Sequence, residues 1–466
     1  MPARHTSARR TAPPPPDATA LPVHYPHAAG IDVGDRSHWV CVGEGEGDVR
    51  EFPAHTAGLR ELVGWLRHRG VTAVALEATG VYGHVLFLTL LEGGFEAVVT
   101  APKFTRQIQG RPKTDKRDCQ WIFRLHAHGL LPPVFQPDDA TQTLREYVRQ
   151  RGNLVRLSAQ HVQRMPKALE LMNLKRTHVV GDVTGVTGWK VVRAILSGER
   201  DPVVLAKLRD RRCKSSEADI ARALDGRYRA EYVYLLRTSL ALWEAYHAQI
   251  AELDTEIEKH LRGMKKCTAL PPLAAKPRVR GRKPHDPAFD VRTALYFATG
   301  VDLTQVEGID AIHALTLVGE LGADFTKWPT VKHFTSWLGL CPNVRQSGGK
   351  VTSSATRRGK NRAAHALRMA AWGLMRSASG VGAFLRRQRS RLGAPKAITA
   401  TAHKLARIVY HLVRFGGEYV KRSEAEYTEQ VRGRLEKQLK RRAKELGFEV
   451  VKTATADPVS PPPQGE

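Results

Sequence analysis

Apolar and polar residues follow a regular order in the first third of the chain, and this order predicts a mixed sheet covered by helices. Short apolar runs predict strands, and stretches with apolar residues every three or four positions predict helices. The expected strands are 29–34, 38–43, 49–54, 71–78 and 95–102, with helices at 56–70, 80–94 and from about 115. Three strands joined by tight turns and then alternating helices and strands indicate an α/β fold.

The rest of the chain has mainly helical periodicity. Residues 138–275 contain two long amphipathic stretches, which predict either an antiparallel coiled-coil arm or an ordinary helical domain. A Pro-rich basic stretch at 276–287 is expected to be a linker or a loop that contacts phosphate. We expect a mainly helical domain at 288–421, and a charged helix with a disordered tail at 422–466. Residues 1–27, with four consecutive prolines, are expected to be a disordered arm.

The net charge of the chain indicates which class of partner it binds. The chain has 466 residues and a formal net charge of +27. A surplus of this size favours nucleic acid as the partner, with a basic but otherwise ordinary soluble protein as the alternative. No continuous apolar run of membrane-spanning length is present, and the five cysteines have no metal or disulfide spacing. We therefore expect a soluble, cytoplasmic protein that does not bind membranes.

Four carboxylates lie within a strand, at a strand end or at a helix start, where a charged side chain is a candidate for a functional role. Asp32 lies within the first expected strand, and Glu77 ends a strongly apolar one. Asp115 and Asp118 lie three residues apart at the start of a helix and so share one face. Each has an ordinary explanation taken alone, because helix starts favour acidic residues and Glu77 could be a capping partner.

Taken together, the four carboxylates suit metal-assisted cleavage of a phosphodiester. Hard oxygen ligands are those that Mg²⁺ prefers, with Mn²⁺ as the alternative, and two such ions can stabilise the leaving oxygen. Lys113, Lys116 and Arg117 are interleaved with Asp115 and Asp118 and could contact phosphate beside them.

Three motifs of this region, GIDVGDRSHWV, LEATGVYG and PKFTRQIQGRPKTDKRDCQWI, occur in the order and spacing of a known family. The chain resembles the DEDD transposases of bacterial insertion sequences, which are relatives of site-specific DNA invertases. The resemblance implies an N-terminal domain of the ribonuclease H-like type, at residues 28–137, similar to Holliday-junction resolvases. It also implies that Asp32, Glu77, Asp115 and Asp118 are catalytic metal ligands.

The second half of the chain extends this resemblance. Residues 306–322 are similar to the helix-hairpin-helix element of the family, although Glu307 replaces the usual proline, which favours a purely structural role. The stretch PNVRQSGGK is expected to be a loop that holds Ser347 before two glycines. By its position this serine is similar to the family's nucleophile, although a Ser-Gly-Gly tract alone is more often a flexible turn.

Basic residues surround that serine and are candidate contacts for nucleic acid. They are Arg345, Lys350, Arg357, Arg358, Lys360 and Arg362. Asn343 and Ala364 stand where many members of the family have arginine. Trp337 and Trp372 could stack on bases, but their spacing among Leu, Ala and Met favours positions in the core.

The resemblance implies a transposase that acts as a DNA recombinase on donor and target DNA through a phosphoserine intermediate. It further implies composite sites in a homodimer or homotetramer, and a structured bridge RNA as the guide. Two other classes stay open: a metal-dependent junction-resolving nuclease that does not use Ser347, and a nucleic-acid-binding protein without enzymatic activity. An inactive remnant of a mobile element is a further possibility, although all five key positions carry competent residues.

Overall fold

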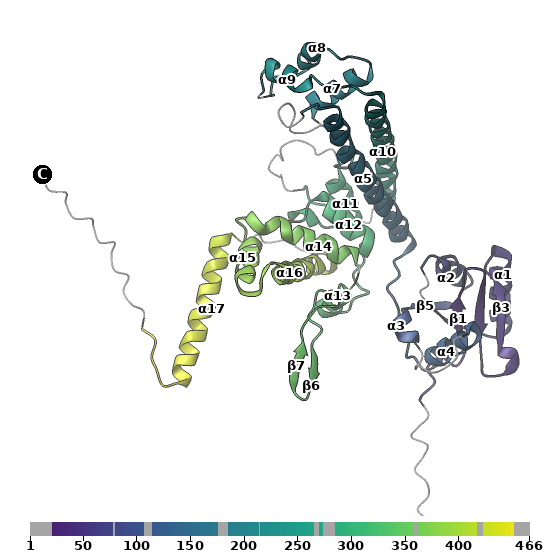
Figure 1. Ribbon diagram of the computed structural model, residues 1–466. Coiled ribbons are helices and arrows are strands. Elements are labelled where there is room, and N and C mark those ends of the chain that lie inside the picture. Colours follow the sequence, from purple (N-terminus) through teal and green to yellow (C-terminus); the bar gives the residue numbers. More distant parts are fainter. Residues whose placement is uncertain are drawn as a thin grey trace, which may run out of the picture. The chain divides into compact units, whose positions relative to one another are not determined.

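The structure is a computed structural model whose chain divides into two compact units, Met1–Gln136 and Pro137–Glu466 (Figure 1). The residues that it describes are 21–77, 80–106, 114–175, 185–213, 215–264, 270–273, 285–357, 359, 361–416 and 423–451. Each unit is described by itself below.

The first unit is built on a five-stranded mixed sheet, as the sequence predicted. Its strands are β1 (Ala28–Val33), β2 (Ser37–Cys41), β3 (Val49–Pro53), β4 (Ala73–Glu77) and β5 (Glu96–Thr100), and their spatial order is β3-β2-β1-β4-β5. β1 and β2 pair antiparallel, as do β2 and β3, whereas β4 is parallel to both β1 and β5. This mixed sheet with helices, followed by a mostly helical remainder, confirms the predicted fold class and is consistent with a ribonuclease H-like domain.

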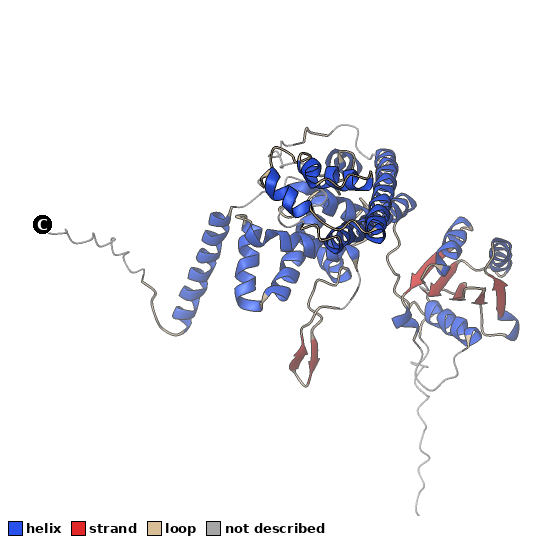
Figure 2. Cartoon of the chain, turned by 45° about the horizontal axis from the view of Figure 1, so that its top comes forward, coloured by secondary structure: helices blue, strands red, loops and turns tan. Residues whose placement is uncertain are grey.

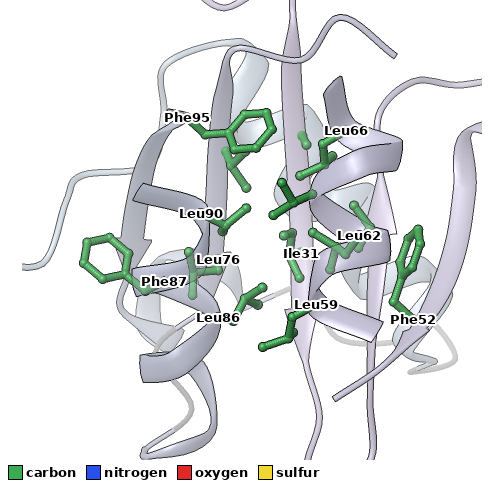
Figure 3. Close-up of a cluster of buried hydrophobic side chains, with 14 of the residues drawn as sticks. Ile31, Phe52, Leu59, Leu62, Leu66, Leu76, Leu86, Phe87, Leu90 and Phe95 are labelled. Atoms are coloured by element: carbon green, nitrogen blue, oxygen red, sulfur yellow. The ribbon is translucent and has the colours of Figure 1, made fainter. Parts of the chain in front are cut away.

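Two helices cover one face of this sheet. α1 (Thr56–His68) and α2 (Tyr82–Glu92) bury leucines against alternate residues of β1 and β4, among them Ile31 and Leu76 (Figure 3). Because strand side chains alternate between faces, the residues between these core positions point to the opposite side of the sheet. That side is covered by α4 (Asp115–Ala127), and a short helix, α3 (Pro102–Thr105), follows β5.

His24 and Tyr25, which the sequence placed in a disordered arm, are packed against the first unit. The backbone N–H groups of His24 and Tyr25 donate to the carbonyl oxygen of Ala127, at 2.8 and 3.0 Å. The ring of Tyr25 also stacks on His126, with 4.7 Å between the ring centroids. The chain therefore packs against the end of α4 before β1 begins, where we had expected disorder up to residue 27. Residues 1–20 lie outside the described range.

The second unit begins with two long helices that run antiparallel. α5 (Asp139–Leu171) contacts α10 (Ala230–Gly263) through His161 with Tyr246 and, towards the other end, through Tyr147 with His260. A buried ion pair lies between these two contacts, where the Arg151 guanidinium donates to the Asp254 carboxylate over 2.5 Å. In the sequence between these helices, α7 (Val186–Leu196), α8 (Pro202–Ala206) and α9 (Glu217–Leu224) form a cap whose apolar core also includes Leu169 of α5 and Leu236 of α10.

The remaining helices form the C-terminal part of the unit. They are α11 (Val291–Thr299), α12 (Ala311–Leu321), α13 (Val331–Trp337), α14 (Arg362–Gly373), α15 (Gly380–Leu392), α16 (Ala394–Phe415) and α17 (Glu424–Glu445). Glu320 of α12 accepts two hydrogen bonds of 2.8 Å from Arg149, which fixes this part to α5. Gly308, in the turn before α12, lies against α14, where an added Cβ would meet the carbonyl oxygen of Ala370 at 2.6 Å.

Two expectations for this unit are wrong. Residues 345–353 form a β-hairpin of β6 (Arg345–Ser347) and β7 (Lys350–Ser353), where we expected an irregular loop. Trp372 is 58% exposed, although its spacing predicted a core position. The reason is that α14 buries a face of small residues, including Ala363 and Ala370, and Trp372 lies on the other face. Trp337, in contrast, packs against Trp328 at 5.2 Å between ring centroids.

Candidate active site

Asp32 and Glu77 lie side by side where the two parallel strands β1 and β4 end. Ile31 pairs with Leu76 across the parallel strands β1 and β4, so the next step of the same register sets Asp32 opposite Glu77. Ile31 and Leu76 point into the core beneath α1 and α2. By strand alternation, Asp32 and Glu77 point to the opposite face, which α4 covers. Neighbouring strands are about 4.8 Å apart, so the two carboxylates share one small region.

Close packing holds α4 on this face. A Cβ added at Gly30 would lie 2.1 Å from the backbone N of Phe123 and 2.6 Å from the carbonyl oxygen of Cys119. Only a glycine lets the helix backbone approach the strand this closely. One turn further along α4, Ile122 is 1% exposed and packs against Ala75 of β4.

The packing of Ile122 determines where the other two carboxylates lie. Asp118 is four residues and Asp115 seven residues before Ile122, so all three project from one face of α4. Asp118 is half-buried and Asp115 is exposed. The start of the helix lies near the end of β1, since the backbone of Cys119, the residue after Asp118, packs against Gly30, two residues before Asp32. The four predicted carboxylates therefore project from the same side of the sheet, near the ends of β1 and β4.

A buried thiol pair fastens α4 to β2 beside these carboxylates. Cys41 and Cys119 are both 0% exposed, and each thiol donates to a backbone carbonyl oxygen over 3.1 Å, Cys41 to Gly43 and Cys119 to Lys116. The neighbouring Cys41 thiol, together with burial, raises the pKa of the Cys119 thiol far above its usual range. Cys119 therefore stays protonated next to Asp118 and adds no charge to the carboxylate cluster.

Thr105 orients one of the carboxylates. Its hydroxyl donates to a carboxylate oxygen of Glu77 and also lies 3.1 Å from the carbonyl oxygen of Pro102. Thr105 is 6% exposed, so this contact is shielded from water. Thr105 is not predicted from the sequence, where its only signal is a position in the same motif as Asp115 and Asp118.

The donor set fits a hard divalent cation. Four carboxylates and no histidine or thiolate are the ligands expected of Mg²⁺ or Mn²⁺. As the side chains stand, no group of three or more His, Cys, Asp or Glu is gathered into a metal site within the described residues. A shared ion therefore requires rotation of the side chains, which the exposed Asp115 and the half-buried Asp118 have room to make.

The predicted cations beside this cluster are only partly described. Lys116 and Arg117 are exposed in the first turn of α4. The backbone N–H of Arg117 donates to the hydroxyl of Thr114, which caps the helix at 3.4 Å. Lys113 lies outside the described residues.

Ser347 ends the first strand of the β6–β7 hairpin, which projects from the helical part of the second unit (Figures 1 and 2). It pairs with Lys350 across the turn Gly348-Gly349. Both glycines have positive φ, 55° and 75°, as a two-residue hairpin turn requires. Ser347, Arg345 and Lys350 are all exposed.

The hairpin presents its serine among cations without supplying a base. The strands read Arg-Gln-Ser and Lys-Val-Thr-Ser, with no carboxylate or imidazole. Arg357 and Arg362 are also exposed, Arg362 at the first position of α14. Arg358 and Lys360 lie outside the described residues. The hairpin can hold a phosphate near Ser347, but activation of the hydroxyl has to come from elsewhere.

Comparison with known proteins shows which class of protein the chain resembles. Residues 29–174 match a family of DEDD transposases of the IS110 type, and residues 302–385 match the transposase family IS116/IS110/IS902. The first match contains Asp32, Glu77, Asp115 and Asp118, and the second contains Ser347. Both regions are thus similar to domains of insertion-sequence transposases.

A curated relative agrees with this class. A protein of Sinorhizobium fredii named "Putative transposase y4qE" is 30% identical over 142 residues, which is 29% of this chain and 36% of that protein. The chain thus matches about a third of the length of this relative. Within the described residues, no helix is long and apolar enough to span a membrane.

Proposed function

We propose that the protein is an insertion-sequence transposase that cleaves and rejoins DNA as a recombinase. The observation that carries this proposal is the placement of Asp32 and Glu77 on adjacent strands beneath the first turn of α4, which presents Asp115 and Asp118. The matches to transposase domains at residues 29–174 and 302–385 support the same reading.

Asp32, Glu77, Asp115 and Asp118 would hold Mg²⁺ or Mn²⁺. Such an ion, when bound, neutralises charge on the scissile phosphate and stabilises the leaving oxygen. The protein's own contribution is to hold the four carboxylates on one side of the sheet and to orient Glu77 through Thr105. Lys116, Arg117 and Lys113 would contact neighbouring phosphates.

Ser347 would be the nucleophile. Its Oγ forms a bond to phosphorus while the bond from phosphorus to a deoxyribose oxygen breaks, and the hydroxyl proton passes to a base. The product is a phosphoserine link, with the freed strand end carrying a hydroxyl. Attack by the hydroxyl of another strand end on the same phosphorus reverses these steps, restores Ser347 and joins the strands. Arg345, Lys350, Arg357, Arg358, Lys360 and Arg362 would bind the DNA backbone.

The partners are proposed from the resemblance and from the missing base in the hairpin. Donor and target DNA are the substrates, and a structured bridge RNA would select them. Because Ser347 has no base in its own hairpin, its activation would come from an acidic cluster in a homodimer or homotetramer. Such an assembly would work in the cytoplasm on the cell's DNA.

The serine mechanism is tested by trapping the covalent link. The full chain is incubated with Mg²⁺, its element's end DNA and the flanking non-coding RNA, then denatured and run on a gel. We expect a labelled protein–DNA adduct that Ser347→Ala abolishes, with Ser353→Ala, a serine of the same hairpin, as the matched control. Asp118→Asn is expected to lower adduct formation at least about 100-fold.

The outcomes separate the competing classes. Strand cleavage that persists in Ser347→Ala but is lost in Asp118→Asn would favour a junction-resolving nuclease. Nucleic-acid binding without any cleavage, unchanged in Asp115→Asn, would favour a non-enzymatic binding protein. Recombination at the parental rate in Ser347→Ala would overturn the proposed nucleophile.

A further inference from the structure

One stretch of the second unit contains most of the surplus charge. Residues 325–417 include 18 lysines and arginines and not one aspartate or glutamate, in a chain whose net charge is +27. The stretch contains the β6–β7 hairpin and helices α13 to α16. A surface made from it attracts a polyanion and repels a second copy of itself.

Within this stretch, α14 carries an exposed row of side chains that we call the α14 ridge. It consists of Arg362, His365, Arg368, Met369 and Trp372. At 100° per residue, His365 and Arg368 lie within about 40° of Trp372 around the helix, and Met369 within about 60°. The opposite face, formed by alanines and Leu367, is buried in the helical core.

The ridge combines a flat aromatic ring with cations. Trp372 is 58% exposed and Met369 is 40% exposed. Arg362 is exposed and Arg368 is half-buried. From Arg362 to Trp372 the helix rises about 15 Å, the length of roughly four stacked nucleotides at 3.4 Å each. An aromatic platform beside arginines is the arrangement that binds single strands, since bases stack on the ring and cations meet the phosphates.

We propose that the α14 ridge binds single-stranded DNA, with an unpaired base stacked on Trp372. Duplex DNA would not fit this use, because its base faces are hidden in the helix. The inference rests on the proposed function, for the ridge starts only 15 residues after Ser347 and lies in the same unit. A strand attacked at the hairpin would continue onto the ridge, which would hold an opened base next to the cleavage point.

The test measures binding in the full chain carrying Ser347→Ala, so that no covalent link forms. Three labelled probes of one sequence are compared by fluorescence anisotropy: a single-stranded DNA 20-mer, its perfect duplex and the single-stranded RNA. Trp372→Ala is expected to weaken single-stranded DNA binding about 5- to 150-fold and to change duplex binding less than about twofold. Trp372→Phe, which keeps an aromatic face, should stay within about threefold of the parent.

Tyr234→Ala is the matched control, because Tyr234 is an aromatic residue of α10 that is 64% exposed. It should leave binding to all three probes unchanged. The proposal is overturned if Trp372→Ala alters none of the probes, weakens duplex binding equally, or weakens RNA binding alone. A change of oligomeric state in Trp372→Ala, measured by light scattering, would also overturn it in favour of a contact between copies.

The two proposals fail separately. A parent chain that binds single strands through Trp372 but forms no adduct would contradict the serine mechanism and leave the ridge in place. Adduct formation together with unchanged binding in Trp372→Ala would contradict the role of the α14 ridge and leave the serine mechanism in place. Thermal melts of each variant, followed by circular dichroism, show whether a loss of binding reflects a loss of folding.

Discussion

At the scale of single residues, the contact between Thr105 and Glu77 decides how one carboxylate is presented. The threonine hydroxyl donates to one carboxylate oxygen of Glu77 and so restricts how that side chain can rotate. Side chains that orient metal ligands in this way commonly change metal affinity as strongly as some of the ligands themselves. Thr105 is therefore a positioning residue in the proposed reaction.

We predict that Thr105→Val weakens Mn²⁺ binding about 10- to 100-fold, because Glu77 loses its hydrogen bond while the volume is kept. Thr105→Ser, which restores the hydroxyl, should bind Mn²⁺ nearly as the parent does. The free Mn²⁺ signal in electron paramagnetic resonance measures both. If the valine and serine variants bind Mn²⁺ equally and differ from the parent only in melting temperature, Thr105 is merely structural.

At the scale of elements, the placement of α4 on the sheet determines whether the four carboxylates meet. Two of them belong to the strands and two to the helix, so their separation depends on the packing of Gly30 against the α4 backbone. The Cys41–Cys119 contact adds a second attachment on β2. A small outward shift of α4 would separate the two halves of the site without touching any carboxylate.

Gly30→Ala is predicted to destabilise the first unit by about 1–3 kcal/mol, since the new methyl group collides with backbone that has no room to yield. It should weaken Mn²⁺ binding as well. Gly64→Ala is the matched control, because a Cβ at Gly64 in α1 meets nothing within 4 Å. This variant should be neutral or slightly stabilising. Chemical denaturation measures both, and equal stability of the two variants would contradict close packing at Gly30.

At the scale of the whole molecule, charge is distributed differently in α17 and in the stretch 325–417. α17 places glutamates beside its arginines, as in the pairs of Arg432 with Glu436 and Arg441 with Glu445. The stretch 325–417 has no such internal compensation. Its exposed cations are therefore the ones expected to displace counterions from a nucleic acid.

We predict that single-stranded DNA binding by the full chain falls steeply with salt, and that α15 contributes more to this slope than α17. Replacing Arg387, Arg389 and Arg391 of α15 with glutamine should reduce the slope of log K against log salt by about 2, at roughly 0.7 per phosphate contact. Anisotropy titrations between 50 and 200 mM salt, about the range in which such contacts weaken, measure it.

The comparison variant carries glutamine in place of Arg434, Lys437 and Lys440, which are exposed on α17. It removes the same formal charge and should change the slope by less than about 1. Equal slopes in the two triple variants would show that net charge alone, and not its location, governs binding.

Much of the first unit could be predicted from the sequence, because its signals are local. Short apolar runs defined the strands and placed Asp32 within one of them and Glu77 at the end of another. The contact of Thr105 with Glu77 and the pairing of Cys41 with Cys119 join distant segments, so no local pattern indicates them. Trp372 was misplaced because its neighbours are small: alanines bury a helix face as well as larger residues do, and leave the tryptophan outside.

The hairpin at Ser347 was missed for a different reason. Gly348-Gly349 is a strong signal for a two-residue turn, but the flanking strands are polar and only three and four residues long. Without an apolar face such strands look like a loop. An isolated two-stranded hairpin is also only marginally stable in water, so its order in function depends on what it binds.

The antiparallel course of α5 and α10 has a consequence for how such a chain can change over evolutionary time. The first match ends at residue 174 and the second begins at 302, and the cap, the returning helix α10 and α11 lie between them. Because α10 brings the chain back beside the start of α5, the cap can be lengthened, shortened or exchanged while α11 still begins in the same place. The two regions that match transposase domains are thus free to retain their structure while the segment between them diversifies.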